Sequence, residues 1–115
     1  MAETEDSDLA PLWATATGRV SDEPFPGVVQ VEFHEEDGTK VVIREKAAVI
    51  DAARCTPAAH YPRSVVLKCR ILAATTRTYD VELAHHVEDL HGRSRFTVHY
   101  ENVDLCRYDE LEFED

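Results

Sequence analysis

The sequence is poor in the residues on which most catalytic and cofactor motifs depend. It has four glycines in 115 residues, and it contains no GxGxxG, GxxxxGK[ST] or GxSxG motif. A loop that cradles phosphate needs several glycines so that its backbone can approach the ligand closely. A nucleophile elbow needs the GxSxG turn. We therefore expect a protein that is not an enzyme and that binds no cofactor.

Cysteine pairs and long apolar runs are also missing. The three cysteines are an odd number with no CxxC spacing, which indicates reduced thiols rather than a disulfide framework. No run approaches the roughly 18 apolar residues of a membrane span. The first residues, MAETEDSDLAPLW, are acidic and lack the basic region and apolar core of a signal peptide. These absences predict a cytoplasmic protein with no membrane partner.

Basic residues are scarce, with 12 against 23 acidic ones, so the formal net charge is −11. The excess acid lies at the two ends: residues 1–8 carry four acids and residues 109–115 carry five, while the rest is nearly neutral. Nucleic-acid binding needs a clustered basic surface and is therefore not expected. Short acidic ends are typical of disordered segments. We expect a disordered N-terminus over residues 1–8, one β-domain over 9–105 and an acidic tail over 106–115.

What the sequence does contain is period-two alternation, most clearly in residues 27–51. Val29, Val31 and Phe33 alternate with polar neighbours, and Val41 and Ile43 repeat the pattern after Asp37-Gly38. Alternation of this kind places one set of side chains on a buried face. Asp-Gly between two such runs is a strong signal for a hairpin turn, because the turn needs positive φ. The stretch is predicted to be a β-hairpin.

Three further strands are predicted, over residues 64–74, 78–84 and 94–100. Residues 9–20 are expected to form a short helix or an extended lead-in. Residues 46–51 are expected to prolong the second hairpin strand or to lead out of it, and residues 102–105 to form one helical turn. A short sheet protects its edges best by closing. The sequence thus predicts an all-β fold, a small five-stranded, mostly antiparallel barrel (SH3-like or OB-like) or a curled sandwich. The expected core is Val29, Val31, Phe33, Val41, Ile43, Val65, Leu67, Cys69, Ile71, Val81, Leu83, Phe96 and Val98.

Histidines gather in the predicted connection over residues 85–93. His85, His86 and His91, together with Glu88, are the weak candidates for a metal site, since imidazole and carboxylate both bind zinc. Adjacent histidines at a strand end point to opposite faces, so the pair supplies one ligand more easily than two. We expect no bound metal. A small metal-dependent enzyme on these residues is kept as an alternative.

Residues 52–63 form the longest irregular stretch, and long loops often carry function. Cys55 and His60 allow a thiol–imidazole pair there, although a packed cysteine is the simpler interpretation. His60 and Tyr61 are predicted to bind a partner. A second alternative is a barrel that binds a small molecule entering through this loop. Cys69, on an apolar strand face, is predicted to be a core residue.

The leading hypothesis is a non-enzymatic protein-binding module. In residues 107–115, RYDELEFED, Tyr108, Leu111 and Phe113 alternate with acids, a composition that orders when docked on a partner. Acidic surface also speeds encounter with a basic partner. A homodimer formed through the exposed edge of the strand over residues 27–34 is the plainest variant.

Several stretches resemble small uncharacterised bacterial all-β proteins, some of which serve as immunity proteins of toxin systems. The resemblance spans about residues 25–105 and implies a bacterial β-fold and an immunity-type or accessory role. The resemblance identifies no functional residues in this sequence. The matching stretches are GVVQVEF (27–33), Asp37-Gly38, KAAV (46–49), Tyr61-Pro62, LKC (67–69) and FTV (96–98).

Overall fold

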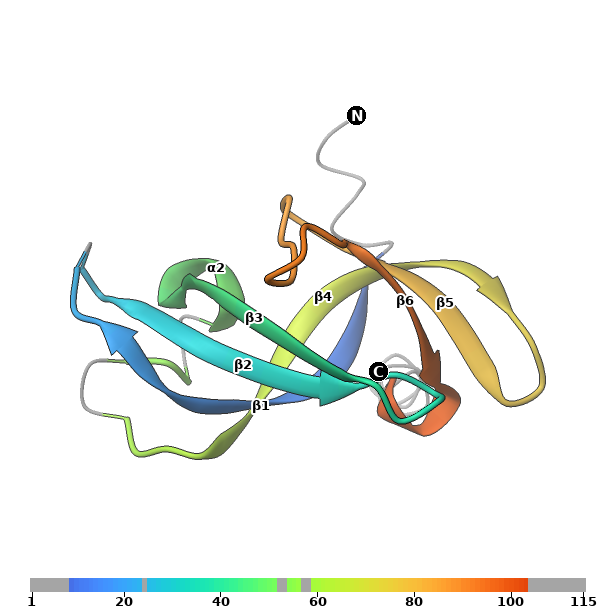
Figure 1. The fold of residues 1–115 in the computed structure, drawn as a ribbon, viewed down its shortest axis with the longest axis horizontal. Coiled ribbons are helices and arrows are strands. Elements are labelled where there is room, and N and C mark those ends of the chain that lie inside the picture. The colour runs from blue at the N-terminus through green and yellow to red at the C-terminus, as the bar shows by residue number, and fades with distance from the viewer. Residues whose placement is uncertain (1–8, 24, 52–53, 57–58, 104–115) are drawn as a thin grey trace, which may run out of the picture.

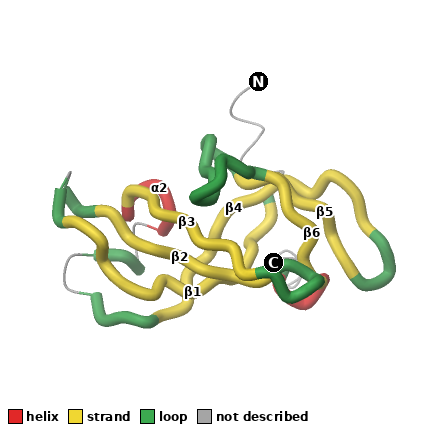
Figure 2. Tube along the Cα trace, in the orientation of Figure 1, coloured by secondary structure: helices red, strands yellow, loops and turns green. Residues whose placement is uncertain are grey.

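A computed structural model describes residues 9–23, 25–51, 54–56 and 59–103. They form one antiparallel six-stranded sheet in the order β3-β2-β1-β4-β5-β6, which curls into a half-barrel (Figure 1, Figure 2). The predicted acidic tails, residues 1–8 and 106–115, lie outside the described residues. The elements are β1 (Ala10–Ser21), β2 (Val28–His34), β3 (Lys40–Lys46), the helix α2 (Ala47–Asp51), β4 (Arg63–Ala74), β5 (Thr78–Leu83), β6 (Arg95–His99) and the 3₁₀ turn η1 (Tyr100–Asn102).

Two long strands, β1 and β4, are each shared between two parts of the sheet. Residues 10–16 of β1 pair with β4, and its later residues pair with β2. Residues 63–69 of β4 pair with β1, and residues 69–74 pair with β5. Register shifts in β1, after Ala16 and after Arg19, and in β4 after Ile71, accompany these changes of partner. Bulges bend and twist a strand, and this is how one sheet becomes a half-barrel.

The predicted small all-β, mostly antiparallel fold is confirmed, with six strands in place of five. The additional strand is β1, where a short helix or lead-in was expected. Leu12, Ala14 and Ala16 are buried and alternate with Trp13 and Thr15 on the other face, which is a strand pattern. Three of the four buried residues of β1 are alanines, including Ala10, and this made the alternation hard to see in the sequence.

Residues 46–51 were expected to prolong the hairpin strand or to lead out of it, and in the structure the strand ends at Lys46. The chain instead turns into α2, whose first amide, at Ala47, donates to the carbonyl of Gly27 at 2.8 Å. Ala47 and Ile50, three positions apart, are the buried residues of this helix and hold it against the sheet. A 3₁₀ turn forms at residues 100–102, where the end of the last strand was expected, and Tyr100 is exposed there; residues 104–105 of the expected helical turn lie outside the described residues.

The predicted core is confirmed apart from Ile71. That side chain is partly buried, because the register of β4 against β5 shifts immediately after it. Cys69 is buried among apolar side chains, as predicted. The other buried predicted residues are Val29, Val31, Phe33, Val41, Ile43, Val65, Leu67, Val81, Leu83, Phe96 and Val98.

The two edges of the half-barrel meet at a seam, which we define as Phe33, Glu35, Arg93, Phe96 and Thr97. The guanidinium of Arg93 donates to both carboxylate oxygens of Glu35, at 3.0 and 3.2 Å. The same carboxylate accepts from the amide of Thr97 at 3.3 Å. The rings of Phe33 and Phe96 meet edge to face at 5.3 Å, and Arg93 lies 4.7 Å above Phe96. The seam therefore combines a bidentate ion pair with aromatic packing.

The strand proposed for dimerisation is not at an edge. β2 lies between β1 and β3, so its backbone groups are used on both sides. The outermost strands are β3 and β6, and both are partly covered: the amide of Leu90 donates to Val42 of β3, and the amide of Glu36 donates to Thr97 of β6. A homodimer through residues 27–34 would require breaking the native sheet.

Candidate functional site: the groove between α2 and β4

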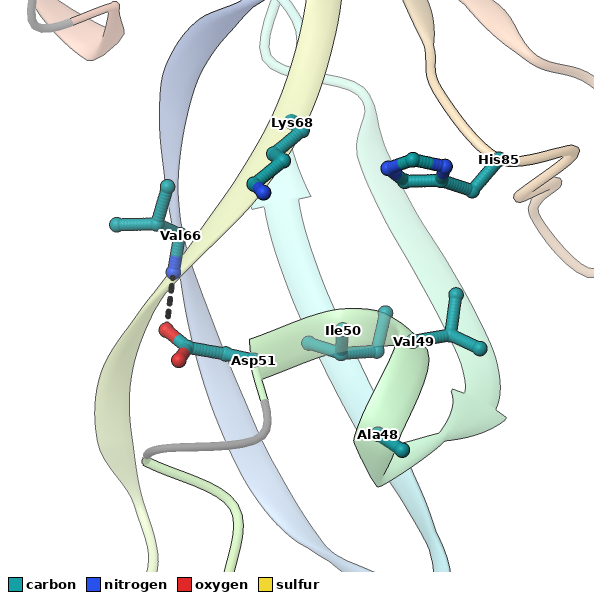
Figure 3. A pocket seen from close by; sticks show the side chains of 7 residues that line it. All are labelled: Ala48, Val49, Ile50, Asp51, Val66, Lys68 and His85. Carbon is teal, nitrogen blue, oxygen red and sulfur yellow. Dashed lines mark hydrogen bonds between the residues drawn. The ribbon is translucent and has the colours of Figure 1, made fainter. Parts of the chain in front are cut away.

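A groove of about 510 Å³ lies between α2 and the first half of β4. Figure 3 shows its side chains: the helix supplies one wall, β4 the other, and His85 from the turn after β5 reaches in from one end. We call it the α2–β4 groove. The residues that line it are Ala48, Val49, Ile50, Asp51, Val66, Lys68 and His85.

The floor of the groove is an open strand edge. Residues 63–68 of β4 pair with β1 on one side, but β5 begins its pairing only at Cys69. Two of the backbone groups on the open side are occupied: Asp51 accepts from the amide of Val66 at 3.2 Å, and the amide of Ala84 donates to the carbonyl of Lys68 at 2.9 Å. Within the described residues, the carbonyl of Val66 and the amide of Lys68 have no hydrogen-bond partner.

The open edge exists because β5 turns away from β4 directly after Ala84. His85 and His86 both have positive φ, 61° and 63°, which is uncommon for residues other than glycine. Two consecutive left-handed residues reverse the chain, and the carbonyl of Ala84 does not reach the amide of Lys68. The histidine pair thus shapes the end of the groove.

The walls near the helix are apolar. Ile50 is buried, and Val49 and Val66 are partly buried. A small hollow of about 10 Å³ opens beneath them, lined mainly by Val49, Ile50, Leu67, Leu83 and Val87. A space of this size holds about one water molecule or part of one small side chain.

Charged groups lie at opposite ends of the groove. Lys68 and His85 are exposed and lie on opposite sides of the upper part of the groove, where the His85 ring points into the groove and the Lys68 side chain extends toward the helix (Figure 3). No ion pair joins either to another described residue. Asp51 lies at the other end, where it caps the Val66 amide and has the Nε of Arg54 at 4.0 Å. The ammonium group of Lys68 is therefore available to an anionic group.

The predicted metal candidates are not assembled into a metal site. Among the described residues, no three of histidine, cysteine, aspartate or glutamate lie close enough together to hold an ion. His85, His86 and Glu88 border a second hollow of about 430 Å³ beside the α2–β4 groove. His91 belongs to a separate turn, where its amide donates to the buried carboxylate of Asp89 at 2.9 Å. That turn is structural, since Asp89 also accepts from the amide of Arg93 at 2.8 Å.

The Cys55–His60 pair is not supported. Cys55 is fully buried, and burial followed by the nearby charge of Asp51 raises the pKa of its thiol. The polar group beside that thiol is the buried hydroxyl of Tyr61, whose own pKa is raised mainly by burial. His60 is exposed. Cys55 is therefore a packing residue, and a thiol with a raised pKa is a poor nucleophile.

We expect both described cysteines to resist alkylation in the native protein. Burial raises the pKa of Cys69 to about 12, so at pH 8 about one thiol in ten thousand is ionised. The measurement is iodoacetamide labelling of a Cys106→Ser variant followed by peptide mapping, with the unfolded protein as the control. Cys106 itself lies outside the described residues. Native labelling of Cys55 at the rate of a free thiol would contradict its placement.

The partner-binding residues predicted from the sequence fall partly outside the structure. Tyr108, Leu111 and Phe113 lie outside the described residues, and Tyr61 packs partly buried against the core. His60 is exposed but does not line the α2–β4 groove. Sequence reasoning missed Val49, Lys68 and the backbone edge of β4. The consecutive histidines His85 and His86 were the one feature of the sequence that indicated this site.

Comparisons with protein-family models, with curated proteins and with solved structures found no match. In the part of the chain that the structure describes, no helix has both the length and the apolar character to cross a membrane. The geometry of the groove is therefore the basis for any functional conclusion.

Proposed function

We propose that this protein is a non-enzymatic protein-binding module and that its α2–β4 groove captures an extended peptide segment. The observation that carries the proposal is the open edge of β4, with the carbonyl of Val66 and the amide of Lys68 at the floor of an apolar groove. A peptide that adds to a strand edge gains main-chain hydrogen bonds, and a neighbouring apolar wall then selects its side chains. The α2–β4 groove has both the open strand edge and the apolar wall.

A small-molecule site has less support. Pockets for small ligands usually enclose most of the ligand and place a few polar side chains around it. The α2–β4 groove is instead an open groove at the surface, and its unpaired polar groups include the exposed backbone edge of β4 beside the side chains of Lys68 and His85. The predicted entrance, residues 52–63, contributes buried side chains such as Cys55 to the core.

The metal-dependent alternative also has less support than peptide binding. His91 is held in a separate turn by Asp89, and His85 lines the same groove as Lys68, a cation that disfavours a bound metal ion nearby. The basic partner predicted from the acidic ends depends on residues outside the described ones, and it stays a prediction.

Peptide binding should be lost when the apolar wall receives a charge. We expect Val49→Asp to weaken binding at least about tenfold, because a carboxylate would have to be desolvated against the peptide. The probe is the tightest peptide selected from a displayed library of random heptapeptides, with affinity measured by fluorescence polarisation. Leu72→Asp is the matched control, since Leu72 is an exposed apolar residue of β4 outside the groove.

Both variants must keep the thermal midpoint of the parent within a few degrees, so that binding and not folding is compared. Equal affinity of the parent and Val49→Asp for the selected peptide would contradict the proposed site. A library that gives no binder at all would contradict peptide capture.

A further inference from the structure

The α2–β4 groove has a direction, and this suggests which part of a partner it binds. We propose that it receives the carboxyl end of a partner chain that runs parallel to β4, with the terminal carboxylate beside Lys68 and His85. This inference rests on the proposed function and specifies its ligand.

The backbone groups of β4 that have no hydrogen-bond partner in the described residues favour a parallel guest strand. An antiparallel partner needs the N–H and the C=O of the same residue. At Val66 the amide is already bonded to Asp51, and at Lys68 the carbonyl is already bonded to Ala84. A parallel partner needs the carbonyl of one residue and the amide of the residue two positions later. Val66 and Lys68 provide this combination. Ser64, the next residue on this edge, lies outside the groove lining.

The α2–β4 groove ends at Lys68. Beyond Lys68 the same edge of β4 is covered by β5, whose pairing starts at Cys69 and Leu83. Ala84 and the His85 turn lie directly in the path of a parallel guest strand. A guest that runs from Ser64 toward Lys68 must therefore end there or bend sharply away.

The side chains at the end of the groove favour a negatively charged group of the guest. At the position where the guest must end, Lys68 and His85 line opposite sides of the groove, and the His85 ring points into it (Figure 3). The amide of Lys68 points into the same space because it is on the open edge. Two cationic or donating side chains and one backbone N–H suit a carboxylate, since hydrogen bonds to ionised groups are the stronger kind. A free amino terminus would meet repulsion at this end.

The geometry also predicts the side chain next to the carboxylate. A guest residue bonded to both Val66 and Lys68 lies opposite Leu67, and neighbours across a sheet share a face. Leu67 faces the core and lines the small hollow beside Ile50 and Val87. The space there is about 10 Å³, so we expect alanine or valine rather than a large side chain.

The test compares one peptide with and without its terminal charge. Random heptapeptides are displayed with free carboxyl ends, the tightest binder is synthesised with an acetylated amino end, and it is made both as the free acid and as the carboxamide. We expect the free acid to bind the full chain at least about tenfold more tightly. Lys68→Gln should weaken the free acid toward the level of the amide and leave the amide nearly unchanged. Lys40→Gln, an exposed lysine of β3 that pairs with Glu32, is the control and should change neither.

Each outcome separates the two proposals. If acid and amide bind equally, and both are weakened by Val49→Asp, peptide capture stands and the carboxylate inference is wrong. If neither peptide responds to Val49→Asp, the groove is not the site and both proposals fail. A selected peptide that needs a free amino end would also overturn the inference, because it would place the opposite terminus at Lys68.

Discussion

Replacing Gly27 by alanine should destabilise the protein by about 3 kcal/mol or more, which is a large part of the stability of a small domain. Gly27 has φ of +121°, a conformation that residues with a Cβ rarely adopt. A Cβ built there would collide with the guanidinium of Arg19 and lie 2.7 Å from the carbonyl oxygen of Ser21. The backbone strain and the collision act together, so the cost exceeds that of strain alone.

Gly27 matters because it leaves room for Arg19. The guanidinium of Arg19 donates to the carbonyl of Pro26 and, at 2.8 Å, to that of Thr56, and so ties the β1–β2 turn to the chain that follows α2. The measurement is urea unfolding of Gly27→Ala beside Gly38→Ala. Gly38 has φ of +91° but no atom within 4 Å of its Cβ position, so its substitution should cost about 1 kcal/mol.

A double-mutant cycle separates the two causes of the Gly27 effect. If the collision contributes, Gly27→Ala should cost less in an Arg19→Ala background than in the parent. Equal stability of Gly27→Ala and Gly38→Ala in the parent would contradict the close packing of Arg19 on Gly27.

Replacing Phe96 by alanine should cost about 3–5 kcal/mol, the range measured when a buried phenylalanine is truncated. Phe96 is 3% exposed, packs edge to face on Phe33 and lies under the guanidinium of Arg93. Its removal leaves a cavity at the seam and takes away the aromatic surface beneath an ion pair. The loss should appear in chemical denaturation as a lower midpoint with an unchanged slope.

Phe25→Ala is the matched control for this prediction. Phe25 is 82% exposed at the tip of the β1–β2 turn, and surface substitutions usually change stability by less than about 0.5 kcal/mol. A Phe96→Ala protein as stable as Phe25→Ala would mean that β6 does not close on the β2–β3 turn in the way described.

The elements that could be predicted from the sequence are those whose signal is local. The hairpin of β2 and β3 was predictable because Val29, Val31 and Phe33 alternate strictly and Asp37-Gly38 marks the turn. β1 was harder to predict, since small alanines supply three of its four buried positions. α2 was missed because five residues are too few to show helical periodicity.

The candidate site was not predictable for a different reason. Its open edge depends on which residues of β4 pair with β1 and which with β5, a register set by contacts between distant segments. Nothing near Lys68 in the sequence shows that its amide lacks a partner. In the same way, the ion pair of Glu35 with Arg93 joins residues 58 positions apart, and no local pattern predicts it. Long-range register decides which strand residues keep unpaired backbone groups.

The pairing of β1 with β4 also has a consequence for how the chain is made. β1 leaves the ribosome well before β4, because its partners in β4 follow 47 to 59 positions later, from Ala16 with Arg63 to Ala10 with Cys69. Contacts so distant in sequence fold slowly, since a long loop must close before they form. The β2–β3 hairpin can form early, but the nascent chain cannot complete its central strand pair until β4 has emerged. During that interval the first half of β1 is an unpaired apolar strand that can aggregate. How long it stays exposed depends on the rate of synthesis and on chaperones, and not on the stability of the native state.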